Sequence, residues 1–102
     1  MSTPVSFGEL LRLRRKKMEM TLIAICRKIG GGFNKGYLSG IENGKVNPPS
    51  ESVTKKLARA LELDEGFLLA LGHATKAPRQ IREQLVKCVW FTGGFSIPPG
   101  VA

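Results

Sequence analysis

Clustered lysine and arginine side chains are the groups in this sequence best suited to binding chemistry, and that chemistry is the attraction of a polyanion. The chain holds 16 Lys and Arg against 8 Asp and Glu, which gives a net charge of +8. Residues 1–50 carry nine basic and three acidic side chains, whereas residues 51–102 carry seven and five. Nucleic acid is therefore the first candidate partner, with the N-terminal half facing it. A basic surface that only favours solubility is the alternative.

Residue types that carry out catalysis are sparse. His73 is the single histidine, and no pair of carboxylates stands at a spacing that indicates acid–base chemistry. The triple glycine 30–32 follows a predicted helix and lacks the Lys-Ser/Thr of a phosphate-binding loop. Cys26 and Cys88 lie far apart and form no CxxC pair, which favours buried thiols over a redox or metal site. We expect no catalytic residue, no metal site and no cofactor.

The length of 102 residues suits one compact domain with a short extension. No apolar run approaches the roughly 18 residues of a membrane span, and the N-terminus has no apolar stretch typical of a signal peptide. We therefore expect a cytoplasmic protein without membrane contact.

Two helices are predicted before the glycine turn. Ser6 followed by Glu9 is typical of a capping box and predicts a helix from Phe7 to near Met18. Thr21 is a candidate cap for a second helix, because apolar residues recur at helical spacing after it: Leu22, Ile25, Cys26 and Ile29. Glycines 30–32 end this helix, since they readily adopt positive φ.

Three further helices are predicted, each after a capping residue. Asn34 caps a helix that ends at Asn43, with Gly44 as its stop. Ser50 is the candidate cap of a fourth helix, and Asp64 of a fifth over residues 65–71. Five short helices joined by tight turns make an all-α domain, which we place at residues 1–72.

Residues 73–102 form the predicted extension, with a linker over 73–78, a C-terminal helix and an irregular tail from residue 97. One face of the helix is apolar and is widened by Val86, Trp90 and Phe91; its central residues are Ile81, Leu85, Cys88 and Val89. Residues 86–97 are also β-branched and aromatic enough for a strand or hairpin, so both structures stay open here.

The most specific motif is Tyr37-Leu38-Ser39-Gly40-Ile41-Glu42-Asn43-Gly44, which follows the second predicted helix and its glycine turn. With Leu57-Ala58-Arg59-Ala60-Leu61 and Phe67-Leu68-Leu69 downstream, about two thirds of the chain resembles the XRE family, the Cro and lambda-repressor type of helix-turn-helix proteins. The resemblance implies that the third helix, 34–43, enters the major groove of DNA while the second crosses the phosphate backbone.

The resemblance also implies which residues face DNA. Leu38 and Ile41 are expected to bury the third helix, and the DNA-facing set is Thr21, Asn34, Lys35, Gly36, Tyr37, Ser39, Gly40, Asn43 and Lys45. Lys35 is the first choice for base readout, since an ammonium donates to guanine O6 and N7; a phosphate contact is its alternative. Thr21 opens the second helix, where free N–H groups suit a phosphate. Tyr37 is expected to pack beneath the helix rather than to bind a phosphate.

An ion pair is implied as well. In the family, an arginine late in the first helix commonly pairs with the glutamate of the third, which is Glu42 here. Arg14 is our first candidate for its partner and Arg15 the second. The rest of the Arg12–Lys17 run is expected to form a solvated face that attracts DNA from a distance.

The sequence departs from the family pattern at three places. Leu22 stands where members often carry a glutamine that braces a phosphate. The turn is about two residues longer than usual, with Phe33 in its buried position. Gly36 and Gly40 replace long polar side chains, which implies sparse direct readout and a larger contribution from DNA shape.

Two functions of different classes remain. The first is a sequence-specific regulator, in particular a repressor, that binds a palindromic operator as a homodimer, because two-fold symmetry doubles the base contacts. Its predicted dimerisation residues are Ile81, Leu85, Val89 and Trp90. The second is a protein-interaction module, such as an antitoxin or antirepressor, that docks a partner through residues 81–91 and binds DNA secondarily. For residues 81–91, packing back onto the fifth helix is a further alternative.

Overall fold

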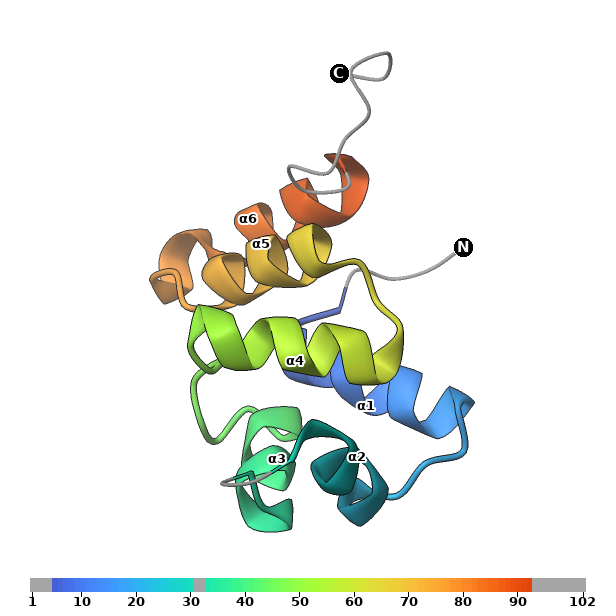
Figure 1. The fold of residues 1–102 in the computed structure, drawn as a ribbon. Coiled ribbons are helices and arrows are strands. Elements are labelled where there is room, and N and C mark those ends of the chain that lie inside the picture. Colours follow the sequence, from blue (N-terminus) through green and yellow to red (C-terminus); the bar gives the residue numbers. More distant parts are fainter. Residues whose placement is uncertain (1–4, 31–32, 93–102) are drawn as a thin grey trace.

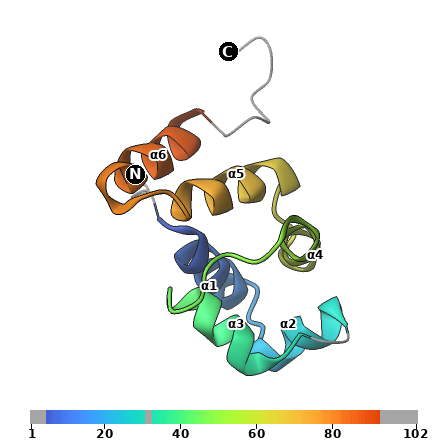
Figure 2. The same ribbon diagram turned by 90° about the vertical axis from the view of Figure 1, so that its left-hand side faces the viewer.

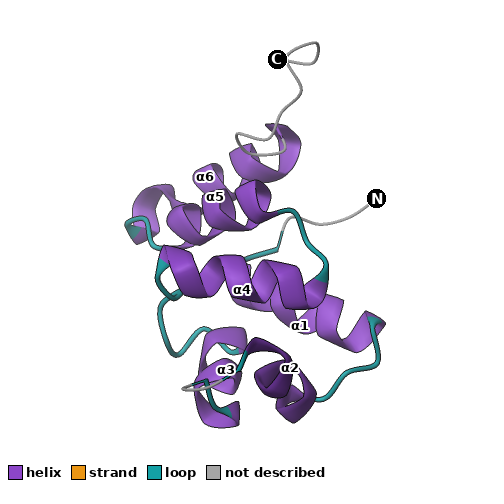
Figure 3. Ribbon diagram, viewed as in Figure 1, coloured by secondary structure: helices purple, strands orange, loops and turns teal. Residues whose placement is uncertain are grey.

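Six α-helices follow one another along the residues that the computed structural model describes, 5–30 and 33–92 (Figure 1). They are α1 (Phe7–Lys17), α2 (Leu22–Ile29), α3 (Lys35–Glu42), α4 (Glu51–Leu61), α5 (Glu65–Thr75) and α6 (Arg79–Thr92). No strand occurs in this part of the chain (Figure 3), so the all-α prediction is confirmed and residues 86–92 are helical. Residues 1–4, the turn glycines 31 and 32, and residues 93–102 with the predicted tail lie outside the described residues.

The helix starts carry the capping residues that the sequence predicts. At α1, the Glu9 carboxylate accepts hydrogen bonds from the backbone N–H and the hydroxyl of Ser6. Ser50 precedes α4, but within the described residues its hydroxyl lies 3.4 Å from that of Ser52 and makes no capping bond. The other three caps each accept a bond from the backbone N–H three residues later: Thr21 at 3.0 Å, Asn34 at 2.8 Å and Asp64 at 2.8 Å.

Two predicted helix ends are confirmed and one is wrong. Gly30 ends α2 with a φ of 101°, and Gly44 follows α3 with a φ of 76°, angles that glycine adopts without strain. The fifth helix, expected to end at residue 71, continues through Gly72 to Thr75, so residues 73–75 are helix rather than linker. A Cβ at residue 72 would stand 3.4 Å from the Phe7 ring. At this distance a side chain at residue 72 would be in ordinary contact with Phe7.

α1 and α4 lie in the middle of the fold, with α2 and α3 at one end and α5 and α6 at the other (Figures 1 and 2). Each of the first five helices contributes to the core, whose largest fully buried side chains are Phe7, Leu11, Ile25, Leu38, Ile41, Leu57, Leu61, Leu68 and Leu71. Burying one such side chain stabilises the fold by roughly 1.5–3 kcal/mol. The short helix α3 is therefore held in place by the shared core more than by its own helical propensity.

α6 packs on α5 with a different face from the one predicted. Val86 is buried in the core cluster, and the Trp90 ring meets Phe67 edge to face with centroids 4.9 Å apart. The Trp90 indole N–H also donates to the Val5 carbonyl at 2.7 Å. Val89 packs against the core as well, so these two predicted dimerisation residues are partly covered by their own chain.

α6 turns this face toward α5 because Trp90 has both a large apolar ring and a polar N–H. An indole buried within its own chain gains both packing and a hydrogen bond, which turns Trp90 toward α5 and the N-terminal segment. Ile81 and Leu85 then point outward with 49% and 38% of their surface exposed. Cys88, expected to be buried, is exposed on the same helix.

Candidate nucleic-acid interface

The outer face of α3 carries most of the predicted DNA-facing residues. Leu38 and Ile41 turn inward and are 1% and 2% exposed, as the sequence predicts. Since α-helical residues four and seven apart share a face, the opposite side is formed by Gly36, Gly40 and Asn43. Of the predicted set, six are exposed and three are half-buried; the exposed ones are Thr21, Asn34, Lys35, Gly36, Asn43 and Lys45, and the half-buried ones Tyr37, Ser39 and Gly40.

Polar groups on this face retain hydrogen-bonding capacity after the fold is formed. The Asn34 carboxamide oxygen caps α3, which leaves its NH2 group as a donor. The Thr21 oxygen caps α2, and its hydroxyl proton can still be donated. The Asn43 NH2 group donates to the Ser39 hydroxyl at 3.3 Å, so the Asn43 oxygen remains an acceptor. Together they offer donors and acceptors, the groups that read base edges and hold phosphates.

Two exposed ammonium groups flank α3. Lys35 is its first residue and Lys45 lies just after its end, and neither has an ion-pair partner within residues 5–30 and 33–92. The start of a helix has a positive partial charge that disfavours a cation. An anion placed beside Lys35 would interact favourably with both the ammonium and the helix.

Tyr37 packs where the sequence analysis expects it. Its ring meets Phe33 edge to face, with centroids 5.2 Å apart, and both side chains pack on the core. Phe33 thus takes the buried turn position between α2 and α3. Leu22 also packs against the core from the first turn of α2.

Gly40 differs from the expectation that it faces DNA directly. The N–H groups of Lys45 and Val46 both donate to the Gly40 carbonyl, at 2.9 Å and 3.2 Å. A Cβ at residue 40 would stand 2.7 Å from Val46 Cγ2, so Val46 covers this glycine. The sequence analysis misses Val46; its only sequence signal is an apolar residue in the otherwise polar loop Gly44–Asn47.

The ion pair of Glu42 is made by Arg15, and the choice of Arg14 is wrong. Arg15 Nε and Nη2 donate to the two Glu42 oxygens at 2.8 Å and 3.0 Å, while Nη1 donates to the Met20 carbonyl at 3.0 Å. Arg14 instead donates to the Leu61 carbonyl at 2.8 Å. The hydrogen bond to Glu42 raises the pKa of Arg15, and burial opposes that rise.

Both arginines flank the buried stripe of α1, which explains the exchange. They stand three and four residues after the buried Leu11, on opposite sides of it, so Arg14 reaches α4 and Arg15 reaches α3. Other cations of the run, Arg12, Lys16 and Lys17, are exposed.

Gly8 forms a second tie between α1 and α3. A Cβ at this residue would overlap the Ile41 carbonyl oxygen and lie 2.8 Å from that of Glu42. The first turn of α1 therefore touches the backbone at the end of α3. Together with the Arg15–Glu42 pair, this contact fixes the orientation of α3.

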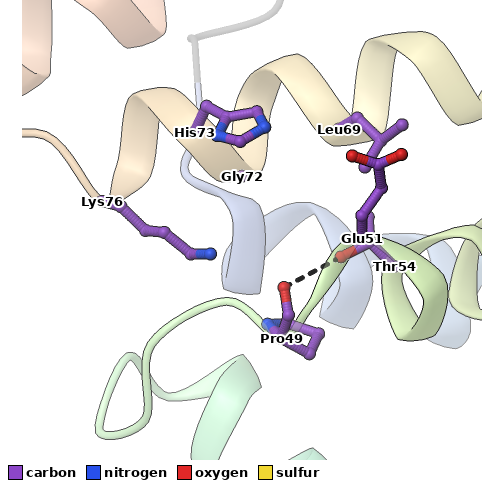
Figure 4. Close-up of a pocket in the computed structure, with 7 residues that line it drawn as sticks. All are labelled: Pro49, Glu51, Thr54, Leu69, Gly72, His73 and Lys76. Atoms are coloured by element: carbon purple, nitrogen blue, oxygen red, sulfur yellow. Dashed lines mark hydrogen bonds between the residues drawn. The ribbon is translucent and has the colours of Figure 1, made fainter.

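A small cavity between α4 and α5 lies outside this interface (Figure 4). Its volume of about 30 Å³ has room for a water molecule or two. His73, expected in a linker, reaches it from α5, and the Thr54 hydroxyl donates to the Pro49 carbonyl at its edge at 3.3 Å. No residue of α2 or α3 lines it; the lining is Pro49, Glu51, Thr54, Leu69, Gly72, His73 and Lys76.

The geometry of α2, a glycine turn and an outward-facing α3 agrees with a comparison of the sequence with known families. The family model described as a helix-turn-helix domain matches residues 6–71. The chain belongs to this helix-turn-helix family. The match agrees with the resemblance to the XRE type and covers α1 to most of α5. No curated protein and no solved structure matches the chain.

The helix-turn-helix assignment indicates DNA binding and makes DNA a partner. In the helix-turn-helix motif, α2 is the first helix and α3 the second, the element that enters the major groove in proteins of this kind. Among the described residues, no helix combines the length and apolarity needed to cross a bilayer.

Proposed function

We propose that the protein is a transcriptional regulator that binds double-stranded DNA sequence-specifically with α3 in the major groove, and that it acts as a repressor. The observation that carries the proposal is the outer face of α3, where Asn34, Lys35 and Asn43 are exposed with groups available to bases. Repression follows as the simplest outcome, since a bound protein excludes others from the same DNA.

Phosphate contacts at the edges of α3 would position it in the groove. Thr21 and the first N–H groups of α2 form a site suited to one phosphate, and Lys45 is suited to another. The net charge of +8 adds long-range attraction that depends on salt.

A homodimer on a palindromic operator is part of the proposal. The exposed apolar side chains of α6, namely Ile81, Leu85 and Phe91, support self-association through this helix. Two-fold symmetry would place the half-sites about 34 Å apart.

The experiment is selection of a randomised duplex library with the purified protein at near-physiological salt. Enrichment of a palindromic sequence supports a dimeric regulator, and salt-labile binding without enrichment contradicts sequence-specific recognition. Lys35→Ala should change the preferred bases if Lys35 reads a base. Lys45→Ala serves as the matched control, since loss of a phosphate contact weakens all sequences alike and lowers the salt slope by about 1.

A protein-interaction module remains the second candidate, because the same exposed side chains of α6 also suit a different protein. Sedimentation of the purified chain separates the two. A dimer that Ile81→Glu converts to monomer supports self-association through α6. A monomer that enriches no DNA sequence favours the antitoxin or antirepressor type of function.

A further inference from the structure

The two glycines on the outer face of α3 have opposite surroundings. Around a Cβ at Gly36, the nearest atom is Asn34 Oδ1 at 3.4 Å, so this position is open. A Cβ at Gly40 would lie only 2.7 Å from Val46 Cγ2. The space that a side chain at residue 40 would fill is therefore occupied by a methyl group from the following loop.

Backbone geometry holds Val46 in this place. The positive φ of Gly44, 76°, reverses the chain after α3. The next two N–H groups, of Lys45 and Val46, then donate to the Gly40 carbonyl. Val46 is thus fixed over the last turn of α3 by two hydrogen bonds to the helix.

Val46 is nevertheless far from buried. It keeps 38% of its surface exposed, although it lies against α3. The helical stripe that it covers is the one opposite Leu38 and Ile41, the side that carries Asn43. Val46 therefore presents an apolar group at the C-terminal end of the outer face of α3, on the side that also carries the polar Asn43.

The major groove offers one kind of apolar group, the C5 methyl of thymine. We propose that Val46 is a specificity-determining residue that contacts a thymine methyl in the operator. The inference rests on the proposed function, in which α3 enters the major groove. It assigns to the loop after α3 a contact that an outward side chain at residue 40 would otherwise make.

The test uses the tightest duplex recovered from the library selection as its probe. Each thymine is replaced in turn by deoxyuridine, which lacks only the methyl group. We expect the wild-type protein to lose about fourfold in affinity at one thymine of each half-site, the effect of one methyl removed from contact. Val46→Ala should bind the thymine and deoxyuridine duplexes equally.

Lys45→Ala is the control from the same loop. It should weaken binding to both duplexes by one factor and keep the preference for thymine. Val46 is partly exposed, so Val46→Ala should fold, which urea unfolding verifies. If Val46 only covers Gly40, the variant weakens binding to both duplexes by one factor and the deoxyuridine effect persists, which overturns the proposal.

The proposed function and this inference fail in different ways. A library without an enriched sequence contradicts sequence-specific binding before any deoxyuridine is introduced, and the inference falls with it. An enriched sequence whose deoxyuridine forms all bind the wild-type protein like the parent duplex contradicts the role of Val46 alone.

Discussion

The Arg15 guanidinium donates hydrogen bonds to both oxygens of the Glu42 carboxylate and so joins α1 to the end of α3. Glu42 is 6% exposed, and Arg15 also bonds to the Met20 carbonyl before α2. One side chain therefore ties together three of the segments that surround the candidate DNA-binding surface. Because the pair is nearly buried, its loss should affect both stability and the placement of α3.

Arg15→Ala should lower the free energy of unfolding by about 3 kcal/mol, because it leaves the Glu42 carboxylate buried without its partner. Arg14→Ala, which removes one hydrogen bond to a backbone carbonyl, should cost about 1.5 kcal/mol. Urea unfolding of both variants measures the difference. A loss for Arg15→Ala no larger than for Arg14→Ala would contradict the importance of the pair.

Gly8→Ala should destabilise the protein by about 1–3 kcal/mol, since the new Cβ overlaps the Ile41 carbonyl and must push α1 away from α3. Gly36→Ala is the matched control, because its Cβ points into open space within a helix. There alanine should be neutral or stabilising by up to about 1 kcal/mol. Thermal unfolding of the two variants checks this, and equal midpoints would refute the close contact at Gly8.

Trp90→Ala should lower the free energy of unfolding by about 3 kcal/mol through loss of its packing on Phe67 and its bond to the Val5 carbonyl. Phe91, its neighbour, is 73% exposed, and Phe91→Ala should change the stability of the single chain by less than about 0.5 kcal/mol. Chemical denaturation distinguishes the two. Similar effects at both positions would show that α6 is rotated relative to the structure described.

The Cys26 thiol should react slowly with alkylating reagents near neutral pH. Burial raises its pKa, and the thiolate is the reactive form. In a Cys88→Ser protein, the rate of Cys26 alkylation should be low at pH 7 and rise only at pH values above the ordinary range of thiols. Mass spectrometry of the alkylated fraction over time measures this, with a denatured sample as the reference; equal rates in both samples would speak against burial.

The apolar pattern predicts most of the helices of this fold, because a helix and its buried face depend on the spacing of residues close together in the sequence. Capping residues such as Thr21, Asn34 and Asp64 are recognised from sequence, since each bonds to a backbone N–H three residues away. The buried stripe of α3, Leu38 and Ile41, follows from helical period.

What the sequence could not predict depends on partners distant in the chain. Arg14 and Arg15 stand on either side of the same stripe, and only the positions of α3 and α4 decide which one meets Glu42. Gly72 is a residue type that often ends a helix, but α5 continues through it to Thr75. The rotation of α6 was likewise decided by a tryptophan bond to a residue 85 positions earlier.

The central layer of α1 and α4 separates α3 from α6, so the two candidate surfaces share no helix. Because of this separation, mutations can change one of the two surfaces without changing the other. In the proposed regulator, substitutions on α6 would change the protein partner without changing the DNA sequence bound, and substitutions around α3 would change the DNA sequence without changing the partner.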